Sequence, residues 1–262
     1  MPTIAPSSHL PRAGSPATDN PSFVEVEGER VALPVEVRSA KMVAATFLVD
    51  ADAAQRVIAP SGLRVARKQR GAKAICSLSA VHYTDNDLGP YNEFAVGFMV
   101  EPAGPGPFPK GAQHTYIHHL PVNQAFTCAA GRGIWGFPKW VTTITFDDHP
   151  GRNGLPDRRG TTTGTVIEDG VLAVRLTVAH SPLPMPSKPM EMVAYSWCDG
   201  VLRSTPWTTR NQAVRGRIGG AAVELGEGTM ADELRSLGLP KKALLTLRTP
   251  RMAATFGLPT EL

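Results

Sequence analysis

The sequence predicts a mainly β protein with one domain, in which an antiparallel sheet closes into a barrel or cone and a few short helices are added. Three observations lead to this prediction. Short runs rich in β-branched and aromatic residues recur along the chain, separated by Gly, Pro and Asp turns. Only two segments have a convincing helical pattern. The chain has 262 residues, of which 42% are hydrophobic and 19% charged, as expected for a globular protein with one large core.

Apolar periodicity and turn residues predict the individual strands and helices. An apolar run predicts a strand over 41–49, and the Asp and alanines after it begin a helix over 50–59. Strands over 72–84 and 92–102 flank the turn-rich "DNDLGPY" and form a hairpin. Further strands are expected over 113–122, 140–148, 160–180 and 243–257. Within 160–180, "EDG" marks the turn of a hairpin. A second helix over 229–238 has Thr229 as its candidate N-cap.

The two ends of the chain differ in composition. Residues 1–22 are rich in Pro, Ser and Ala and offer little to bury, which predicts a disordered or loosely ordered tail before a domain spanning 23–262. No charged segment followed by an apolar one indicates a signal peptide. No run approaches the roughly 20 apolar residues of a membrane helix. We therefore expect a cytoplasmic protein that does not bind a membrane.

Charge and cysteine usage exclude several classes of protein. The net charge of +4 comes from 27 Lys and Arg against 23 Asp and Glu, and the one basic run, "RVARKQR" at 64–70, has no aromatic platform or reader motif beside it. Nucleic acid is therefore not an expected partner. Cys76, Cys128 and Cys198 are widely spaced and form no CxxC pair, so we interpret them as reduced core residues.

Two other motifs suggest chemistry but do not complete a site. His114 and His118 in "HTYIHH" are four residues apart, a spacing known from metal sites, but no carboxylate or cysteine lies near them in sequence. The Gly-rich stretch 217–228 has neither a GxGxxG nor a P-loop spacing and is interpreted as a loop. We predict no metal and no cofactor.

The stretch "GRGIWGFPKW" at 131–140 places one lysine, Lys139, among aromatic residues. If "WGFPK" is extended, as a residue before proline prefers, then Trp135, Phe137 and Lys139 lie on one side by the alternation of a strand. Desolvation disfavours a charged amine, and a neutral amine is a nucleophile toward carbonyl carbon. The alternative is that the rings are part of the core and the amine reaches out to water.

The same stretch resembles the active-site signature of the acetoacetate decarboxylase family, in which "GRE…(Y/F)PKK" presents a lysine that forms a Schiff base with a keto acid. Lys139 falls on that lysine. "DNDLGPYNEF" at 85–94 is similar to the family's "GLG-x-Y-x-E" turn and puts Glu93 on its pocket glutamate. The segments 163–178 and 244–257 resemble the hairpin after the lysine and the closing strand. The resemblance covers about 40–257 and implies the family's β fold.

The chain also departs from the family pattern. Trp140 stands where the family has a second lysine, and Gly133 stands where it has a glutamate. A neighbouring cation is one way to activate a lysine, and acetoacetate decarboxylase is a known example; here we expect desolvation by Trp135, Phe137 and Trp140 to replace it. A second pocket glutamate of the family aligns with Leu78, and Arg38 is only a nearby candidate for its carboxylate-binding arginine.

The resemblance implies an enzyme in which Lys139 attacks a keto acid and Glu93 orients the substrate or moves protons. The reaction expected first is decarboxylation of a 3-oxo acid in a pocket made more apolar by Leu78 and Trp140. Two alternatives stay open. One is aldol and dehydration chemistry on 2-oxo acids through the same imine, and the other is a non-catalytic member that binds a carbonyl ligand. Glu93 could also be an exposed turn carboxylate. The family habit of symmetric assembly implies a homo-oligomer.

Overall fold

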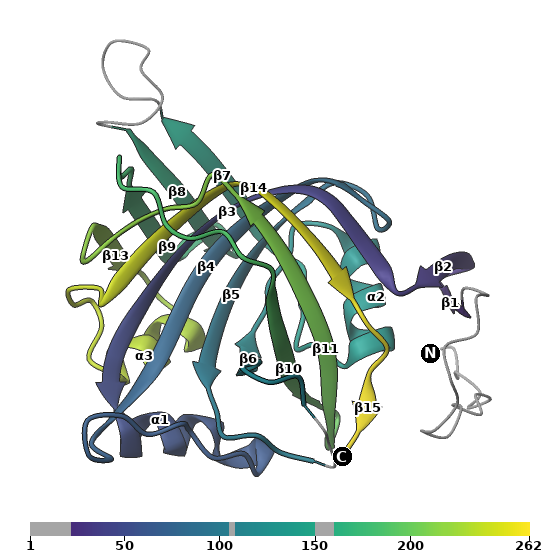
Figure 1. Cartoon of the computed structure of the whole chain (residues 1–262), viewed down its shortest axis with the longest axis horizontal. Helices are drawn as coiled ribbons and strands as arrows, with labels where there is room; N and C mark the ends of the chain where they lie inside the picture. Colours follow the sequence, from purple (N-terminus) through teal and green to yellow (C-terminus); the bar gives the residue numbers. More distant parts are fainter. Residues whose placement is uncertain (1–21, 105–107, 150–159) are drawn as a thin grey trace.

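A computed structural model describes residues 22–104, 108–149 and 160–262. Seven long strands form a closed barrel in the ring order β14, β3, β4, β5, β6, β10, β11, with β11 pairing back onto β14 (Figure 1). Their bounds are β3 Val35–Asp50, β4 Lys73–Asn86, β5 Tyr91–Met99, β6 Gln113–His119, β10 Met190–Cys198, β11 Val201–Gln212 and β14 Leu245–Phe256. The pairings are antiparallel except β6 with β10, which are parallel. The predicted barrel is confirmed, with one parallel pair added.

A second sheet of four strands covers part of the barrel's outer surface. It has the order β13, β9, β8, β7, with bounds β7 Thr143–His149, β8 Thr161–Glu168, β9 Val171–Ala179 and β13 Ala221–Leu225. Its apolar face and the outward face of β3, β4 and β5 share one core, together with two helices. The layers approach closely at Gly164, where an added Cβ would lie 2.2 Å from the Cβ of Ala80. The main core of the protein therefore lies between the two sheets.

Three helices and a short 3-10 turn complete the core and the barrel ends. They are α1 Ala51–Ile58, η1 Ala59–Ser61, α2 Ala125–Trp135 and α3 Thr229–Ser236. The Asp50 carboxylate caps α1 by accepting from the backbone N–H groups of Asp52 and Ala53, as its sequence predicts. Gly228, not Thr229, is the N-cap of α3, and no side chain caps it. None of the helices in these described parts is long and apolar enough to cross a membrane.

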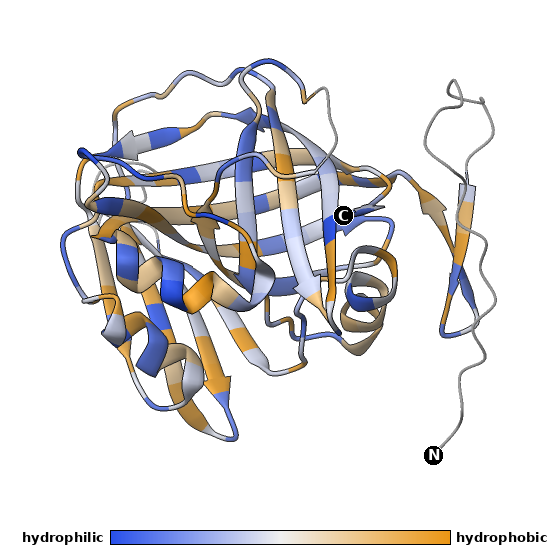
Figure 2. Cartoon of the chain, turned by 90° about the horizontal axis from the view of Figure 1, so that it is seen from below, coloured by the Kyte–Doolittle hydropathy of each residue, from blue (hydrophilic) through white to orange (hydrophobic). Residues whose placement is uncertain are grey.

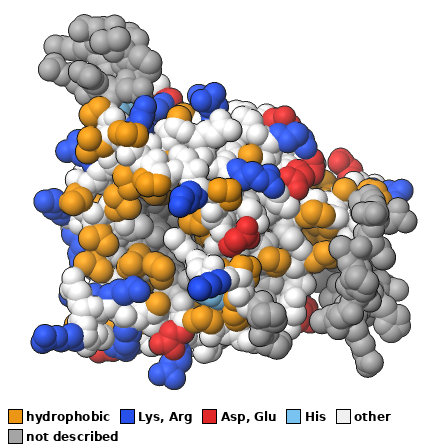
Figure 3. All heavy atoms as spheres, viewed as in Figure 1, with side chains coloured by type: hydrophobic (Ala, Val, Ile, Leu, Met, Phe, Trp, Pro, Cys, Tyr) orange, Lys and Arg blue, Asp and Glu red, His pale blue; other side chains and the backbone are white. Residues whose placement is uncertain are grey.

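Smaller strands add to the edges. They are β1 Ser22–Val26 and β2 Glu29–Leu33, which form a hairpin beside the barrel next to α2 (Figure 2), and β12 Arg215–Arg217 and β15 Thr260–Glu261. The predicted tail falls on residues 1–21, which lie outside the described residues, and on Ser22, which begins β1. On the face shown in Figure 3, Lys and Arg side chains are spread among apolar and neutral ones and form no continuous patch.

Three features differ from the sequence prediction. Helix α2 was not expected, because its glycines and alanines give a weak amphipathic pattern. Strands β10 and β11 were also not expected, although they close the barrel. The Gly-rich stretch 217–228 is not only a loop, because β13 lies within it and pairs with β9. Of the cysteines, Cys76 and Cys198 are buried, Cys128 is partly buried, and all three are free, as predicted.

Candidate active site

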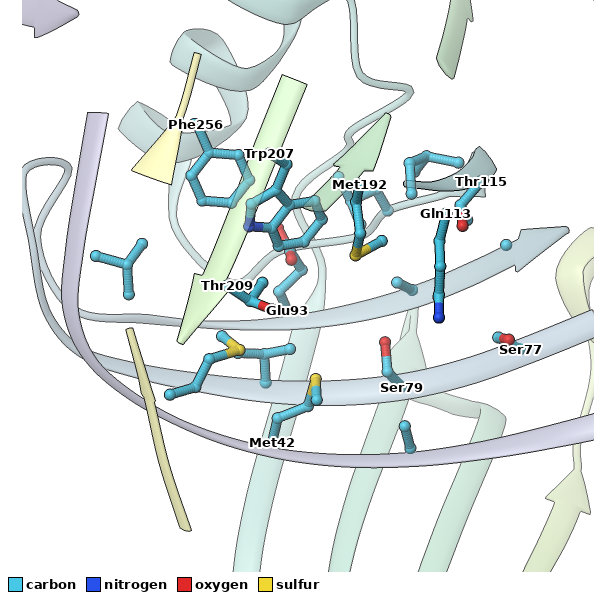
Figure 4. Close-up of a pocket in the computed structure, with 18 of the residues that line it drawn as sticks. Met42, Ser77, Ser79, Glu93, Gln113, Thr115, Met192, Trp207, Thr209 and Phe256 are labelled. Carbon is cyan, nitrogen blue, oxygen red and sulfur yellow. The ribbon is translucent and has the colours of Figure 1, made fainter. Parts of the chain in front are cut away.

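A cavity of about 500 Å³ lies inside the barrel. Because successive residues of a strand face opposite sides, every second residue faces this cavity. The lining residues are Met42, Ala44 and Thr46 from β3, Ser77 and Ser79 from β4, and Glu93, Ala95 and Gly97 from β5. Trp207, Thr209 and Met192 line it from β11 and β10, and Figure 4 shows these side chains pointing into a common space. The lining is mostly apolar, with a few neutral polar groups, as is usual for small-molecule sites.

Lys139 and Glu93 form a buried ion pair in the cavity wall. The Lys139 Nζ donates to Glu93 Oε2 at 2.8 Å, and the two side chains are 4% and 7% exposed. They are the only Lys, Arg, Asp or Glu among the described residues that line the cavity. A charge buried here without a partner would cost several kcal/mol, and the short contact between the two groups offsets part of that cost.

Two stacked tyrosines lie beside this pair, and one of them holds the carboxylate. Tyr83 donates from its hydroxyl to Glu93 Oε1 at 3.0 Å, and its ring stacks on Tyr91 with centroids 4.3 Å apart. The Lys139 Nζ lies 5.1 Å from the centroid of the Tyr91 ring, within cation–π range. Burial, and then the negative charge of Glu93, raise the pKa of both tyrosines well above the ordinary value. Both phenols therefore stay protonated at neutral pH.

Helix α2 and the turn after it place Lys139. The helix ends at Trp135 because Gly136 adopts a left-handed conformation with φ 63°, and its N–H bonds back to Arg132 O. Trp135 is anchored by its Nε1, which donates to Gly257 O at 2.9 Å. Gly131 lets the lysine side chain lie against the helix, since an added Cβ there would be 2.5 Å from Lys139 Cδ. The sequence thus needs glycine at both positions.

The structure brings four of the seven predicted site residues together. Lys139, Glu93, Trp135 and Phe137 all line the cavity. The prediction that strand alternation places Trp135, Phe137 and Lys139 on one side is wrong. Trp135 is the last residue of a helix, and Gly136 turns the chain between Trp135 and Phe137. The same turn buries Lys139, which excludes the alternative of an amine reaching out to water. The alternative of an exposed Glu93 is also wrong, since that residue is 5% exposed.

The other three predicted residues do not line the cavity. Leu78 points to the opposite face of β4, into the core between the sheets. Trp140 turns away from the lysine: its Nε1 donates to Glu168 Oε1 at 3.0 Å and its ring meets the ring of His119 edge to face. Arg38 lies at the surface, where ion pairs with Asp85 and Asp87 hold it. None of the three is among the residues that line this cavity, because register and turn geometry decide which face a side chain takes.

Sequence reasoning missed the two tyrosines and the cavity's far wall. Tyr83 and Tyr91 are register partners across the β4–β5 hairpin, and each lies four residues from Asp87, so a hairpin centred on Asp87 would have paired them. Trp207 and Phe256, whose rings stack with centroids 4.5 Å apart, belong to β11 and β14, and β11 was not predicted. No sequence signal indicated that these strands return to face Lys139.

Comparison with known proteins identifies the family. The family model described as acetoacetate decarboxylase matches residues 20–255. The chain therefore belongs to the acetoacetate decarboxylase family, as its lysine motif predicts. No curated protein sequence matches the chain significantly.

Several solved structures have the same fold. The enduracididine biosynthesis enzyme MppR, complexed with the condensation product of pyruvate and imidazole 4-carboxaldehyde, has a TM-score of 0.65 at 16% identity, over 94% of this chain and 98% of that chain. An acetoacetate decarboxylase-like enzyme from Sphingomonas wittichii has a TM-score of 0.60 at 17% identity, over 95% and 100%. Acetoacetate decarboxylase from Legionella pneumophila has a TM-score of 0.61 at 15% identity, over 87% of each chain.

Proposed function

We propose that this member of the acetoacetate decarboxylase family is a carbon–carbon lyase in which Lys139 forms a Schiff base with a keto acid. Decarboxylation of a 3-oxo acid with an apolar chain is the reaction that we assign first. The buried pair of Lys139 and Glu93 in the wall of a cavity carries this proposal. A lone lysine amine facing a substrate-sized space, with a carboxylate at hydrogen-bonding distance, has the parts that imine chemistry requires.

The first step needs a neutral amine. Glu93 accepts a proton from Lys139 across their 2.8 Å contact, and the amine then attacks the carbonyl carbon of the substrate. Loss of water from the resulting carbinolamine forms the protonated imine. Tyr83, still a neutral phenol, donates to Glu93 throughout and keeps its carboxyl group oriented toward the amine.

The protonated imine then acts as an electron sink. The bond between the α-carbon and the carboxylate of a 3-oxo acid breaks and carbon dioxide leaves. The electron pair of that bond forms a C=C bond to the imine carbon, and the π electrons of the C=N bond move onto the nitrogen to give a neutral enamine. The carbon takes up a proton, for which protonated Glu93 is the nearest carboxylic donor among the described residues of the cavity wall. Water hydrolyses the imine, releasing a ketone and the free amine.

The cavity indicates the class of substrate. The cavity volume of about 500 Å³ is in the range of roughly 300–1,000 Å³ that is typical of pockets for drug-sized ligands. A four-carbon keto acid would therefore leave most of the cavity empty. Met42, Met192 and Trp207 supply flexible and flat apolar surfaces. These residues, not Leu78 or Trp140, make the pocket apolar. We therefore assign a 3-oxo acid with an extended hydrocarbon or aromatic substituent.

Borohydride trapping tests the proposal. The protein is incubated with 3-oxo acids of increasing chain length, reduced, and measured by intact mass and peptide mapping, with carbon dioxide release followed in parallel. We expect one adduct per chain, on Lys139, and faster release with longer chains. Lys139→Arg keeps the positive charge and should abolish the adduct, while Lys110→Arg, a change at an exposed lysine, should not. An adduct that persists in Lys139→Arg would refute the assignment.

Aldol chemistry is the second candidate. Its support is the likeness to MppR, whose structure contains a condensation product of pyruvate and an aldehyde. The same imine at Lys139 would form an enamine from a 2-oxo acid, and this enamine would attack the aldehyde carbon. Incubation with pyruvate and an aromatic aldehyde distinguishes the two reactions, because condensation yields a conjugated product without release of carbon dioxide.

A non-catalytic member would bind a carbonyl compound without turnover. Such a protein would show the trapped adduct at Lys139 but no product with any substrate of either panel. We also propose that the chain forms a homo-oligomer, as its family resemblance implies, and light scattering of the purified protein measures this directly.

A further inference from the structure

Two adjacent histidines and one glutamate converge outside the barrel, away from the cavity. His118 Nε2 and His119 Nε2, at the end of β6, lie 2.8 Å and 2.6 Å from the same oxygen, Glu233 Oε2 on α3. One ligand atom from each of the three residues lies within 4.8 Å of the others. The sequence argument against a metal, that no carboxylate lies near "HTYIHH", does not hold in three dimensions. His114 takes no part, since its Nδ1 bonds to the hydroxyl of Tyr195.

A β-bulge explains how two consecutive strand residues reach one carboxylate. Neighbouring residues of a regular strand point to opposite faces. Here Val96 pairs with His119 whereas Gly97 pairs with Ile117, so His118 is the extra residue on β6. Bulges re-aim side chains in this way and are frequent near functional sites. The inward side chain of Ile117 still lines the cavity, while both histidines face α3.

We propose that His118, His119 and Glu233 bind one divalent transition-metal ion such as Zn²⁺. Two imidazole nitrogens and a carboxylate oxygen are ligands that zinc accepts, and three protein ligands leave a position for water. Tetrahedral bonds of about 2.0–2.2 Å place such ligand atoms roughly 3.3 Å apart. The two histidine–carboxylate separations of 2.8 Å and 2.6 Å therefore need to open by roughly half an ångström, and the ligand atoms of the three residues already lie within 4.8 Å of one another. The side chains are 14%, 15% and 32% exposed, which gives an ion and its water access.

The surroundings suit a metal site. Both histidines contact one oxygen of the Glu233 carboxylate, and that side chain is about one third exposed. Aromatic rings enclose the histidines: Phe98 and Tyr116 contact His118, and Trp140 contacts His119 edge to face. Such a shell limits rotation of the ligands and shields the ion's field. A bound ion would join α3 to the barrel.

Metal titration of the full, tag-free chain after chelator treatment tests the site. We expect one Zn²⁺ per chain by calorimetry, a rise in melting temperature with added Zn²⁺, and visible absorption of bound Co²⁺ typical of four or five ligands. X-ray absorption of the zinc-loaded protein should show nitrogen and oxygen ligands at about 2.0–2.2 Å and no sulfur.

Variants distinguish this site from adventitious binding. Glu233→Gln keeps a hydrogen-bond acceptor for the histidines but removes the charged ligand, and His118→Gln removes one imidazole ligand. Each variant should weaken Zn²⁺ binding by at least about tenfold, the effect that is typical even for losing a residue that only hydrogen-bonds to a ligand. His149→Gln, a change at an exposed histidine elsewhere, should leave affinity unchanged. Circular dichroism confirms that each variant is folded. No saturable binding up to about a hundred micromolar Zn²⁺, or binding that both ligand variants retain in full, would overturn the proposal.

Discussion

The two faces of strands β3, β4 and β5 are built on opposite principles. Their outward side chains, such as Phe47, Leu78 and Phe98, are fully buried between the sheets. Their inward side chains, such as Thr46, Ser79 and Ala95, are small or polar, line the cavity and are partly exposed. The outside of this barrel wall therefore faces the packed core, and the inside faces the cavity that we propose as the binding space. Stability and function are thus separated by the two-residue period of the strands.

The largest effect is expected on the free energy of unfolding when a side chain of the packed face is shortened. Leu78→Ala removes a fully buried side chain from the packed face and should lower the free energy of unfolding by about 2–5 kcal/mol. Ser79→Ala, the next residue on the cavity face, should change it by less than about 0.5 kcal/mol. Urea denaturation measures both. Equal losses would mean that the two faces do not differ in packing as described.

A smaller effect is expected at the contact between helix α2 and the site. Gly131→Ala places a methyl group 2.5 Å from Lys139 Cδ, so the lysine side chain must move, at a cost of about 1–3 kcal/mol typical of overpacking. We expect slower imine trapping at Lys139. Gly133→Ala is the matched control, because its added Cβ meets nothing within 4 Å. It should keep the wild-type trapping rate and stabilise the helix by up to about 1 kcal/mol. Parallel slowing in both variants would contradict the contact.

On the cavity face, Glu93→Gln preserves shape and removes the charge beside Lys139. We expect turnover to fall by at least about tenfold, or 1.4 kcal/mol of barrier, because no carboxylate is left to carry protons. Borohydride-trappable imine with a good carbonyl ligand should persist, since the amine itself is intact. Single-turnover kinetics separate the two steps. A wild-type rate of turnover would remove Glu93 from the mechanism, and a folded variant without imine would give it a positioning role instead.

The smallest effect concerns the thiol reactivity of the packed face compared with that of helix α2. Cys76 points into the packed core, and burial raises its pKa to about 12, so almost none of it is thiolate at neutral pH. Cys128 is only partly buried. At pH 8, iodoacetamide should label Cys128 first and Cys76 only after unfolding, as mass spectrometry of timed samples would show. Early labelling of Cys76 would indicate local opening of the core.

Much of the fold was predictable because it depends on local patterns. The hairpins around "DNDLGPY" and "EDG" were correctly predicted from their turn residues, and α1 from the Asp50 cap. Helix α2 was missed because a run of glycine and alanine has little periodicity, and it becomes a helix through packing of Ile134 and Trp135. Arg38 was a candidate for the family's carboxylate-binding arginine and Trp140 follows Lys139 in sequence, but their side chains contact Asp85 and Glu168 instead of lining the cavity.

The barrel class and the family could be inferred from the amino-acid sequence, and so could the two main candidate residues, Lys139 and Glu93, because these two lie in short motifs of distinctive composition. Folding brings these two residues into a pair, places Tyr83 on the carboxylate, and brings Glu233 to two histidines. These contacts join residues separated by 46, 10 and about 115 positions. Strand register and a β-bulge set them, and both arise from pairing along the whole length of the strands.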